Sequence, residues 1–162
     1  MTTQDSKKLK KLFKLIRYSL YNGKEITQNF DIPFKYDKNI SQIYITLFQK
    51  DISSIRWGSK KESFIETINR IITKLRSNLN FHMFDIDDNS TCRIMFEIVT
   101  KQYPCNIRNL TTMSMSSQNR YEPGVNGLKY TYKNVTRFFM PTDGFTKSIM
   151  SVNQLLLSLK TM

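Results

Sequence analysis

The chain has few of the side chains on which most enzymes and metal proteins depend. Its 162 residues include one histidine, two cysteines and five glycines. Cys92 and Cys105 are too few for a disulfide framework or a four-ligand zinc site, and the single His82 excludes most imidazole chemistry. Neither a GxGxxG nor a GKS phosphate-binding pattern occurs. We therefore expect no enzymatic activity, no metal site and no cofactor.

Alanine and long apolar runs are missing as well. Not one alanine occurs, whereas Ile, Lys, Asn, Phe and Tyr are abundant. Because alanine codons are GC-rich, this bias indicates an AT-rich genome, such as that of an organelle or a reduced endosymbiont. No apolar run reaches the length of about 18 residues that a membrane-spanning helix requires. With 40% hydrophobic and 23% charged residues, we expect a globular protein without membrane insertion.

Positive charge is present in excess. The chain has 25 Lys and Arg against 13 Asp and Glu, which leaves a formal net charge of +12. Solubility requires less than this, and such an excess is typical of proteins with a polyanionic partner, most often a nucleic acid. Between Lys7 and Lys24 there are seven basic residues and no acidic one.

The same N-terminal segment also carries apolar residues at helical spacing. This pattern predicts an amphipathic helix that ends near Asn22-Gly23. Its predicted polar face holds Lys7, Lys10, Lys11, Lys14 and Arg17. In isolation, a solvated helix face without any ligand explains such lysines equally well. The net charge of the whole chain favours phosphate binding instead.

Two further helices are predicted in the first half of the chain. Apolar residues recur at helical spacing over 40–52. Ser59 and Glu62 have the spacing of a capping box, which predicts a helix over 59–77. The remaining patterns predict strands over 52–57, 92–100, 107–115 and 128–140, turns over 87–90 and 141–144, and a closing strand or helix at 155–157.

These elements together predict an α+β fold with two small lobes. Residues 1–90 form the expected N-terminal lobe, in which helices pack on a small sheet and one helix lies near 59–77. Residues 91–162 form the expected C-terminal lobe, which is mainly β with a short helix and binds RNA. Aromatic and basic residues alternate in its second half, a mixture suited to phosphate contact and base stacking. For Phe138 and Phe139, packing in the core is the simpler interpretation.

The order of these features resembles the small-subunit ribosomal protein eight family, which binds small-subunit ribosomal RNA directly. Leu12–Leu20 (LFKLIRYSL) is similar to the family's first helix, and Asp31–Phe34 to its Ile-Pro-Tyr-Ser-Lys segment. Arg93–Tyr103 is similar to the central strand and Ser114–Tyr121 to the Ser-Lys-Pro-Gly-Arg-Arg-x-Tyr segment. Met140–Gly144 stands where the family has its Ser-Thr-Ser-x-Gly loop. Between 52 and 93 the chain is longer than a bacterial member by about one helix, as the 59–77 segment would explain.

The resemblance implies a non-catalytic structural protein of the small ribosomal subunit, which we expect in mitochondria, on the matrix side, in keeping with an organelle-encoded gene. Its partners would be small-subunit ribosomal RNA and neighbouring small-subunit proteins, with no small-molecule substrate. The loop at 140–144 would enter the minor groove of an RNA junction, with Thr142 and Gly144 in contact. A stand-alone RNA-binding assembly or translation factor is the alternative, because it needs the same basic surface. The predicted RNA-binding residues are Lys10, Lys14, Arg17, Lys35, Lys38, Ser116, Arg120, Tyr121, Thr142, Gly144 and Lys147.

Overall fold

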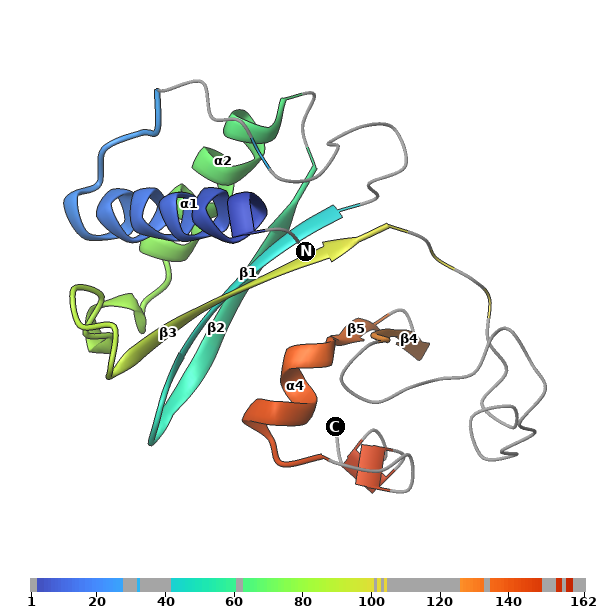
Figure 1. Cartoon of the computed structure of the whole chain (residues 1–162). Helices are drawn as coiled ribbons and strands as arrows, with labels where there is room; N and C mark the ends of the chain where they lie inside the picture. The colour runs from blue at the N-terminus through green and yellow to red at the C-terminus, as the bar shows by residue number, and fades with distance from the viewer. Residues whose placement is uncertain are drawn as a thin grey trace. The chain divides into compact units, whose positions relative to one another are not determined.

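The computed structural model has an α+β fold, as the sequence predicts (Figure 1). It describes residues 3–27, 32, 42–60, 63–100, 102, 104, 126–132, 135–149, 154, 155, 157 and 158. The chain divides into two compact units, Met1–Gln102 (unit 1) and Tyr103–Met162 (unit 2). Among the helices of the described residues, none has the length and apolar character needed to cross a membrane.

Unit 1 is built on a three-stranded antiparallel sheet. Its strands are β1 (Gln42–Gln49), β2 (Ile52–Ser59) and β3 (Cys92–Val99), in the order β2-β1-β3. Strands β2 and β3 confirm the predicted strands, and the connection between them includes the predicted turn at 87–90. A two-residue turn joins β1 to β2, and Asp51 in this turn has a positive φ of 63°.

The predicted helix over 40–52 is wrong, because residues 42–49 form the central strand β1. This strand pairs with β2 on one side and with β3 along its whole length on the other. Ile43, Ile45 and Leu47 point to one face of the sheet, in agreement with the two-residue period of a strand. Tyr44 and Thr46, on the opposite face, are buried as well. Burial of both faces removed the alternation that identifies a strand in the sequence.

The boundary between the units follows from this pairing. Since β3 is hydrogen-bonded to β1, it belongs to the same sheet as β1 and β2. The division therefore lies after Gln102 rather than at residue 90. The predicted strand over 107–115 and the polar segment over 114–121 lie outside the described residues.

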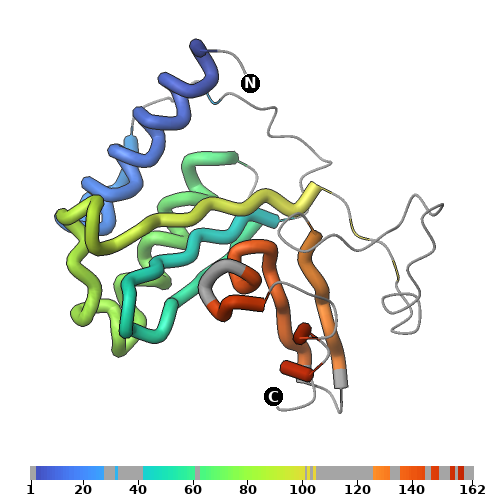
Figure 2. Tube along the Cα trace, turned by 60° about the horizontal axis from the view of Figure 1, so that its bottom comes forward, coloured from blue at the N-terminus to red at the C-terminus, as the bar shows by residue number. Residues whose placement is uncertain are grey.

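Two helices pack on one face of the sheet of unit 1. They are α1 (Thr3–Asn22) and α2 (Phe64–Arg76), and both views of the chain show them on the same side of the strands (Figures 1 and 2). The core between helices and sheet contains Leu12, Ile16, Leu20, Ile43, Ile45, Leu47, Ile68, Ile71 and Leu75, all essentially inaccessible to solvent. Burying each such side chain stabilises the fold by about 1.5–3 kcal/mol.

The capping residue of α2 differs from the predicted one. Ser63 is the N-cap: its hydroxyl accepts a hydrogen bond from Glu66 N (3.2 Å), and the Glu66 carboxylate accepts one from Ser63 N (3.3 Å). The predicted capping residue Ser59 is instead the last residue of β2, and Glu62 lies outside the described residues. The helix near 59–77 is thus confirmed, but it begins at Phe64 because the strand continues through Ser59.

The C-terminal end of α1 is held by two contacts from α2. The Arg76 guanidinium donates hydrogen bonds to the carbonyl oxygens of Leu20 and Tyr21, which have no partner within α1. Gly23 ends the helix with a φ of 72°, in agreement with the predicted end at Asn22-Gly23. The Asn69 side chain then fixes the outgoing chain, because it donates to Ile26 O and accepts from Ile26 N, both at 3.0 Å.

Unit 2 contains a β-hairpin followed by a short helix. The hairpin consists of β4 (Leu128–Tyr132) and β5 (Val135–Phe139), so the strand pattern over 128–140 is two strands. Helix α4 (Pro141–Thr146) follows directly, and Gln154, Leu155, Leu157 and Ser158 are also helical. Phe139, Ile149 and Leu155 form a small core against which Leu128 packs.

The predicted tight turn at 141–144 is wrong, because these residues form the first turn of α4. Pro141 occupies a position in the first turn of the helix, where its fixed φ suits a helix and its missing N–H has no partner to lose. The Asp143 carboxylate accepts a hydrogen bond of 2.7 Å from Met140 N. Proline followed by an acidic residue within one turn is typical of the beginning of a helix. Here this helix signal prevails over the turn signal that Pro, Asp and Gly also give.

Candidate nucleic-acid interface

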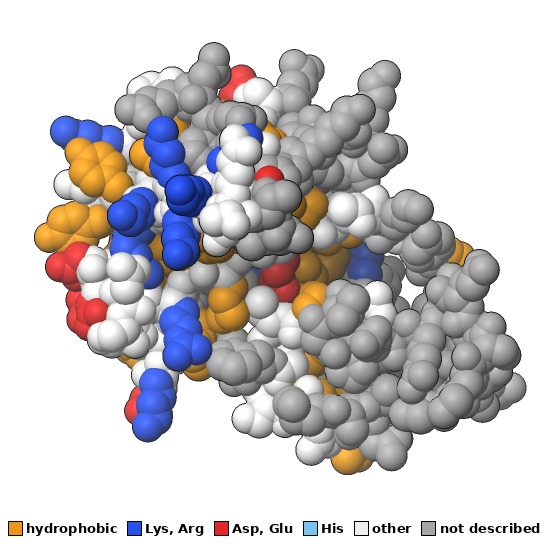
Figure 3. Space-filling view, in the orientation of Figure 1, with side chains coloured by type: hydrophobic (Ala, Val, Ile, Leu, Met, Phe, Trp, Pro, Cys, Tyr) orange, Lys and Arg blue, Asp and Glu red, His pale blue; other side chains and the backbone are white. Residues whose placement is uncertain are grey.

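The outward side of α1 is strongly basic. Lys7, Lys10, Lys11 and Lys14 are all exposed on it. On the opposite side of the helix, Leu12, Ile16 and Leu20 are buried in the core of unit 1. Lys and Arg side chains gather over α1 on the face of the molecule shown in Figure 3. The structure therefore brings the predicted residues Lys10 and Lys14 together on a rigid helix.

Two exposed tyrosines continue this side of α1 toward its C-terminal end. Tyr18 is 55% exposed and Tyr21 is 59% exposed. Together with Lys7, Lys11 and Lys14 they are spaced four, three, four and three residues apart, which places all five on one side of the helix. We call these five residues the Lys–Tyr stripe. The lysines were predicted from the sequence, whereas the tyrosines were missed, although the same spacing could have found them.

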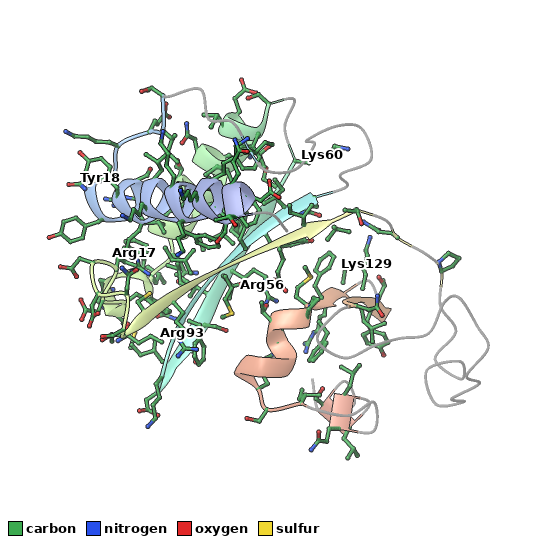
Figure 4. All side chains as sticks on the ribbon, in the orientation of Figure 1. Arg17, Tyr18, Arg56, Lys60, Arg93 and Lys129 are labelled. Atoms are coloured by element: carbon green, nitrogen blue, oxygen red, sulfur yellow. The ribbon has the colours of Figure 1, made fainter. Side chains whose placement is uncertain are left out.

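Arg17 does not share the outward orientation of the lysines. Its side chain is partly buried, and its guanidinium donates hydrogen bonds to the carbonyl oxygens of Ile86, Asp88 (3.4 Å) and Cys92 (2.8 Å) (Figure 4). It connects α1 to the segment that leads into β3. The predicted phosphate contact of Arg17 is therefore replaced by an internal one, because three backbone acceptors lie within its reach.

The acidic segment beside Arg17, which includes Asp85, Asp87 and Asp88, forms a turn that is held by hydrogen bonds among its own residues. The Asp88 carboxylate accepts hydrogen bonds from Ser90 N (2.7 Å), from the Ser90 hydroxyl and from the Thr91 hydroxyl (2.5 Å). These bonds lower the pKa of Asp88 to about 2. A side-chain hydrogen bond with Asp87 raises the pKa of Asp85. Among the described residues, no group of three or more His, Cys, Asp and Glu side chains is placed to hold a metal ion.

The β4–β5 hairpin presents a second mixed surface, in unit 2. Lys129 pairs with Phe138 across the strands, and both are exposed; Lys129 Nζ lies 6.0 Å from the centre of the Phe138 ring (Figure 4). Thr131 and Thr136 extend this face, with their hydroxyl oxygens 3.1 Å apart. Phe139 is only 3% exposed, so its interpretation as a core residue is confirmed. Phe138 is 43% exposed, so the same interpretation is wrong for this residue.

The predicted residues Thr142 and Gly144 lie on α4 rather than on a loop, and Lys147 is the residue that follows the helix. Gly144 is buried, and a Cβ added there would come within 3.1 Å of Ile149 O. Thr142 is half-buried, and Lys147 is exposed at the end of the helix. Gly144 therefore permits close packing and is not accessible to a ligand, whereas Lys147 is. The other predicted residues, Lys35, Lys38, Ser116, Arg120 and Tyr121, lie outside the described residues.

Comparison with known proteins identifies no relative. No protein-family model, no curated protein and no solved structure matches the chain. The resemblance to the small-subunit ribosomal protein eight family therefore stays a prediction.

Proposed function

We propose that this chain is a non-catalytic, RNA-binding structural protein of the small ribosomal subunit of mitochondria. The observation that carries the proposal is the exposed basic side of α1, which is held in place by the buried core on its other side. Ribosomal RNA supplies the density of negative charge that a protein with a net charge of +12 requires. Neighbouring small-subunit proteins are the further partners.

The lysines of α1 bind phosphates through their charge alone. Each phosphate that a lysine neutralises releases condensed counterions, so affinity falls as salt rises, with a slope of about 0.7–0.9 per contact in a double-logarithmic plot. Four exposed lysines on one rigid helix contact several phosphates at once, because the helix holds them at fixed spacing. Such contacts position the protein on RNA without reading its sequence.

A lipid surface is a poorer partner for the same helix. An amphipathic helix that lies on a membrane inserts its apolar side between the lipids. In α1 this side, with Leu12, Ile16 and Leu20, is already buried against α2 and the sheet. The lysines alone would then have to hold the membrane, whereas for RNA they are sufficient.

Sedimentation tests the proposal. A mitochondrial extract that contains the tagged chain is separated on sucrose gradients at moderate and at high salt, and the chain is followed by mass spectrometry. We expect it in the small-subunit fraction at both salt concentrations, since structural proteins remain in mature particles. A chain that binds RNA but sediments outside subunits and monosomes would instead be the stand-alone assembly or translation factor.

A matched pair of variants tests the part played by α1. Lys10→Gln with Lys14→Gln removes two lysines from the exposed side of the helix, and Lys50→Gln removes an exposed lysine from the turn between β1 and β2. We expect the α1 variant to lower the salt slope of binding to ribosomal RNA by about 1.5, and the control to leave it nearly unchanged. A control that lowers the slope by half as much as the α1 variant, in proportion to the charge removed, would show that the charge acts only as a total and not through α1.

A further inference from the structure

We propose that the Lys–Tyr stripe of α1 binds a single-stranded segment of RNA, with its lysines on the phosphates and Tyr18 and Tyr21 stacked on unpaired bases. The inference rests on the proposed function in one respect, namely that the partner is RNA. It adds the structural class of RNA that this helix recognises and the two residues that recognise it.

The stripe changes its chemistry along its length. Its N-terminal part, from Lys7 to Lys14, offers ammonium groups over about 10 Å of helix, and the tyrosines follow within the next two turns. About 10 Å corresponds to roughly three nucleotides of one strand in a stacked helix. A strand that follows the stripe therefore contacts lysines through its backbone first and then meets two aromatic rings.

The tyrosines are presented on a fixed backbone. Asn22 Nδ2 donates to Tyr18 O at 3.0 Å, and Arg76 donates to Tyr21 O at 3.2 Å. Gly23 N donates to Ser19 O at 2.9 Å and closes the last turn. With the backbone held in this way, the rings lose little freedom on binding, because a tyrosine side chain has only two rotatable bonds of importance.

Unpaired bases fit these rings better than a duplex does. Bases inside a stem are stacked on each other and offer no face, whereas unpaired bases have free faces that stack on aromatic side chains. The charge of α1 itself agrees with an RNA partner, because the segment from Lys7 to Lys24 contains no acidic residue. Acidic residues do lie near this helix in the turn beside Arg17, where Asp88 is bound by Ser90 and Thr91. The stripe thus combines the two contacts, to phosphate and to base, that proteins use on single-stranded RNA.

Fluorescence anisotropy on the purified full-length chain tests the inference with two RNAs. One is a short blunt duplex, and the other is the same duplex with a single-stranded overhang. Two double variants are compared, Tyr18→Ser with Tyr21→Ser and Tyr18→Phe with Tyr21→Phe. The second pair keeps the rings and removes only the hydroxyls, and circular dichroism checks that both variants are folded.

We expect the serine pair to bind the overhang RNA at least about tenfold more weakly than the wild type does, because each stacked base is worth about 1–3 kcal/mol. Its affinity for the blunt duplex stays unchanged, and so does its salt slope, because no charge is removed. The phenylalanine pair binds both RNAs like the wild type.

The inference is overturned if the serine pair binds both RNAs like the wild type. The proposed function survives that result when the lysine variant of α1 still lowers the salt slope, so the two failures are distinguishable. A serine pair that binds RNA normally but no longer enters the small subunit also overturns the inference, since the tyrosines would then contact a protein.

Discussion

Arg17 and Lys14 lie one helical turn apart on α1. We predict that Arg17 stabilises the fold and does not bind RNA, whereas Lys14 binds RNA and does not stabilise the fold. Lys14 is exposed on the Lys–Tyr stripe, whereas Arg17 donates hydrogen bonds to three carbonyl oxygens that lead into β3. Arg17→Met and Lys14→Met each remove one positive charge and keep an unbranched side chain with good helix propensity. Any difference between the two variants therefore reports the local contacts and not the total charge.

The expected magnitude follows from the contacts of Arg17. Two of its hydrogen bonds, to Ile86 O and Cys92 O, are close, and the third is long at 3.4 Å. A hydrogen bond from a charged donor contributes about 1.5–3 kcal/mol. Because Arg17 is only partly buried, we take the lower value for the two close bonds and expect Arg17→Met to lower the free energy of unfolding by about 3 kcal/mol. Lys14→Met should change it by less than about 0.5 kcal/mol.

Urea unfolding followed by tryptophan fluorescence measures this difference. Trp57, in β2, is the single tryptophan of the chain, so the signal reports on unit 1. In RNA binding the order of the variants reverses: Lys14→Met lowers the salt slope by about 0.7–0.9, and Arg17→Met does not. An Arg17→Met protein as stable as the wild type, with a reduced salt slope, would refute the reasoning and return Arg17 to the RNA surface.

Three further predictions concern the core and the ionisable groups of unit 1. Ile45→Ala, at a fully buried position of the central strand, should lower the free energy of unfolding by about 3 kcal/mol in the same urea assay. Burial raises the pKa of the Cys92 thiol, so in a Cys105→Ser background iodoacetamide should leave the folded protein unmodified at neutral pH and react only after unfolding in urea. The pKa of Asp88, lowered to about 2 by hydrogen bonds from Thr91 and Ser90, means that the folded state favours the carboxylate. The contribution of Asp88 to the free energy of unfolding is complete above the pKa of the unfolded state, about 4, and is lost as the pH falls toward 2. An NMR titration of the Asp88 carboxyl carbon measures this pKa in the folded protein, and an ordinary value near 4 would contradict the prediction.

Elements with local signals were predictable from the sequence, and elements defined by their neighbours were not. Helix α1 has a long apolar period and a glycine at its end, both of which are local signals. Strand β1 lies between two other strands and is buried from Ile43 to Leu47, so its apolar residues follow each other and imitate one turn of a helix. Only the partners of this strand, which lie three to sixteen residues away in β2 and 43 to 57 residues away in β3, distinguish the two structures.

The same distinction applies to the candidate site. The lysines of α1 were predicted because charge on the polar side of an amphipathic helix needs no knowledge of the rest of the fold. Arg17 was assigned to the same surface because its acceptors, at Ile86 to Cys92, lie about seventy residues later in the sequence. Gly144 was assigned to a loop because Pro, Asp and Gly at 141–144 are turn signals and the family resemblance has a loop there, whereas in the structure these residues begin α4 and the Asp143 carboxylate accepts a hydrogen bond from Met140 N.

The contrast between Arg17 and its neighbour Tyr18 shows what can be derived once the buried side of α1 is known. Ile16 and Leu20 are fully buried, and Tyr18 lies two residues from each, which places it on the opposite side of a helix with 3.6 residues per turn. Arg17 lies at the border of the buried side and turns inward. The exposed surface of α1 therefore offers four lysines and no arginine, and these lysines account for a salt slope of about 3. If the measured salt slope of the whole chain is larger than this, the additional phosphate contacts come from cations outside α1. Variants of Lys129, Arg137 and Lys147, which are exposed in unit 2, are the first with which to test this.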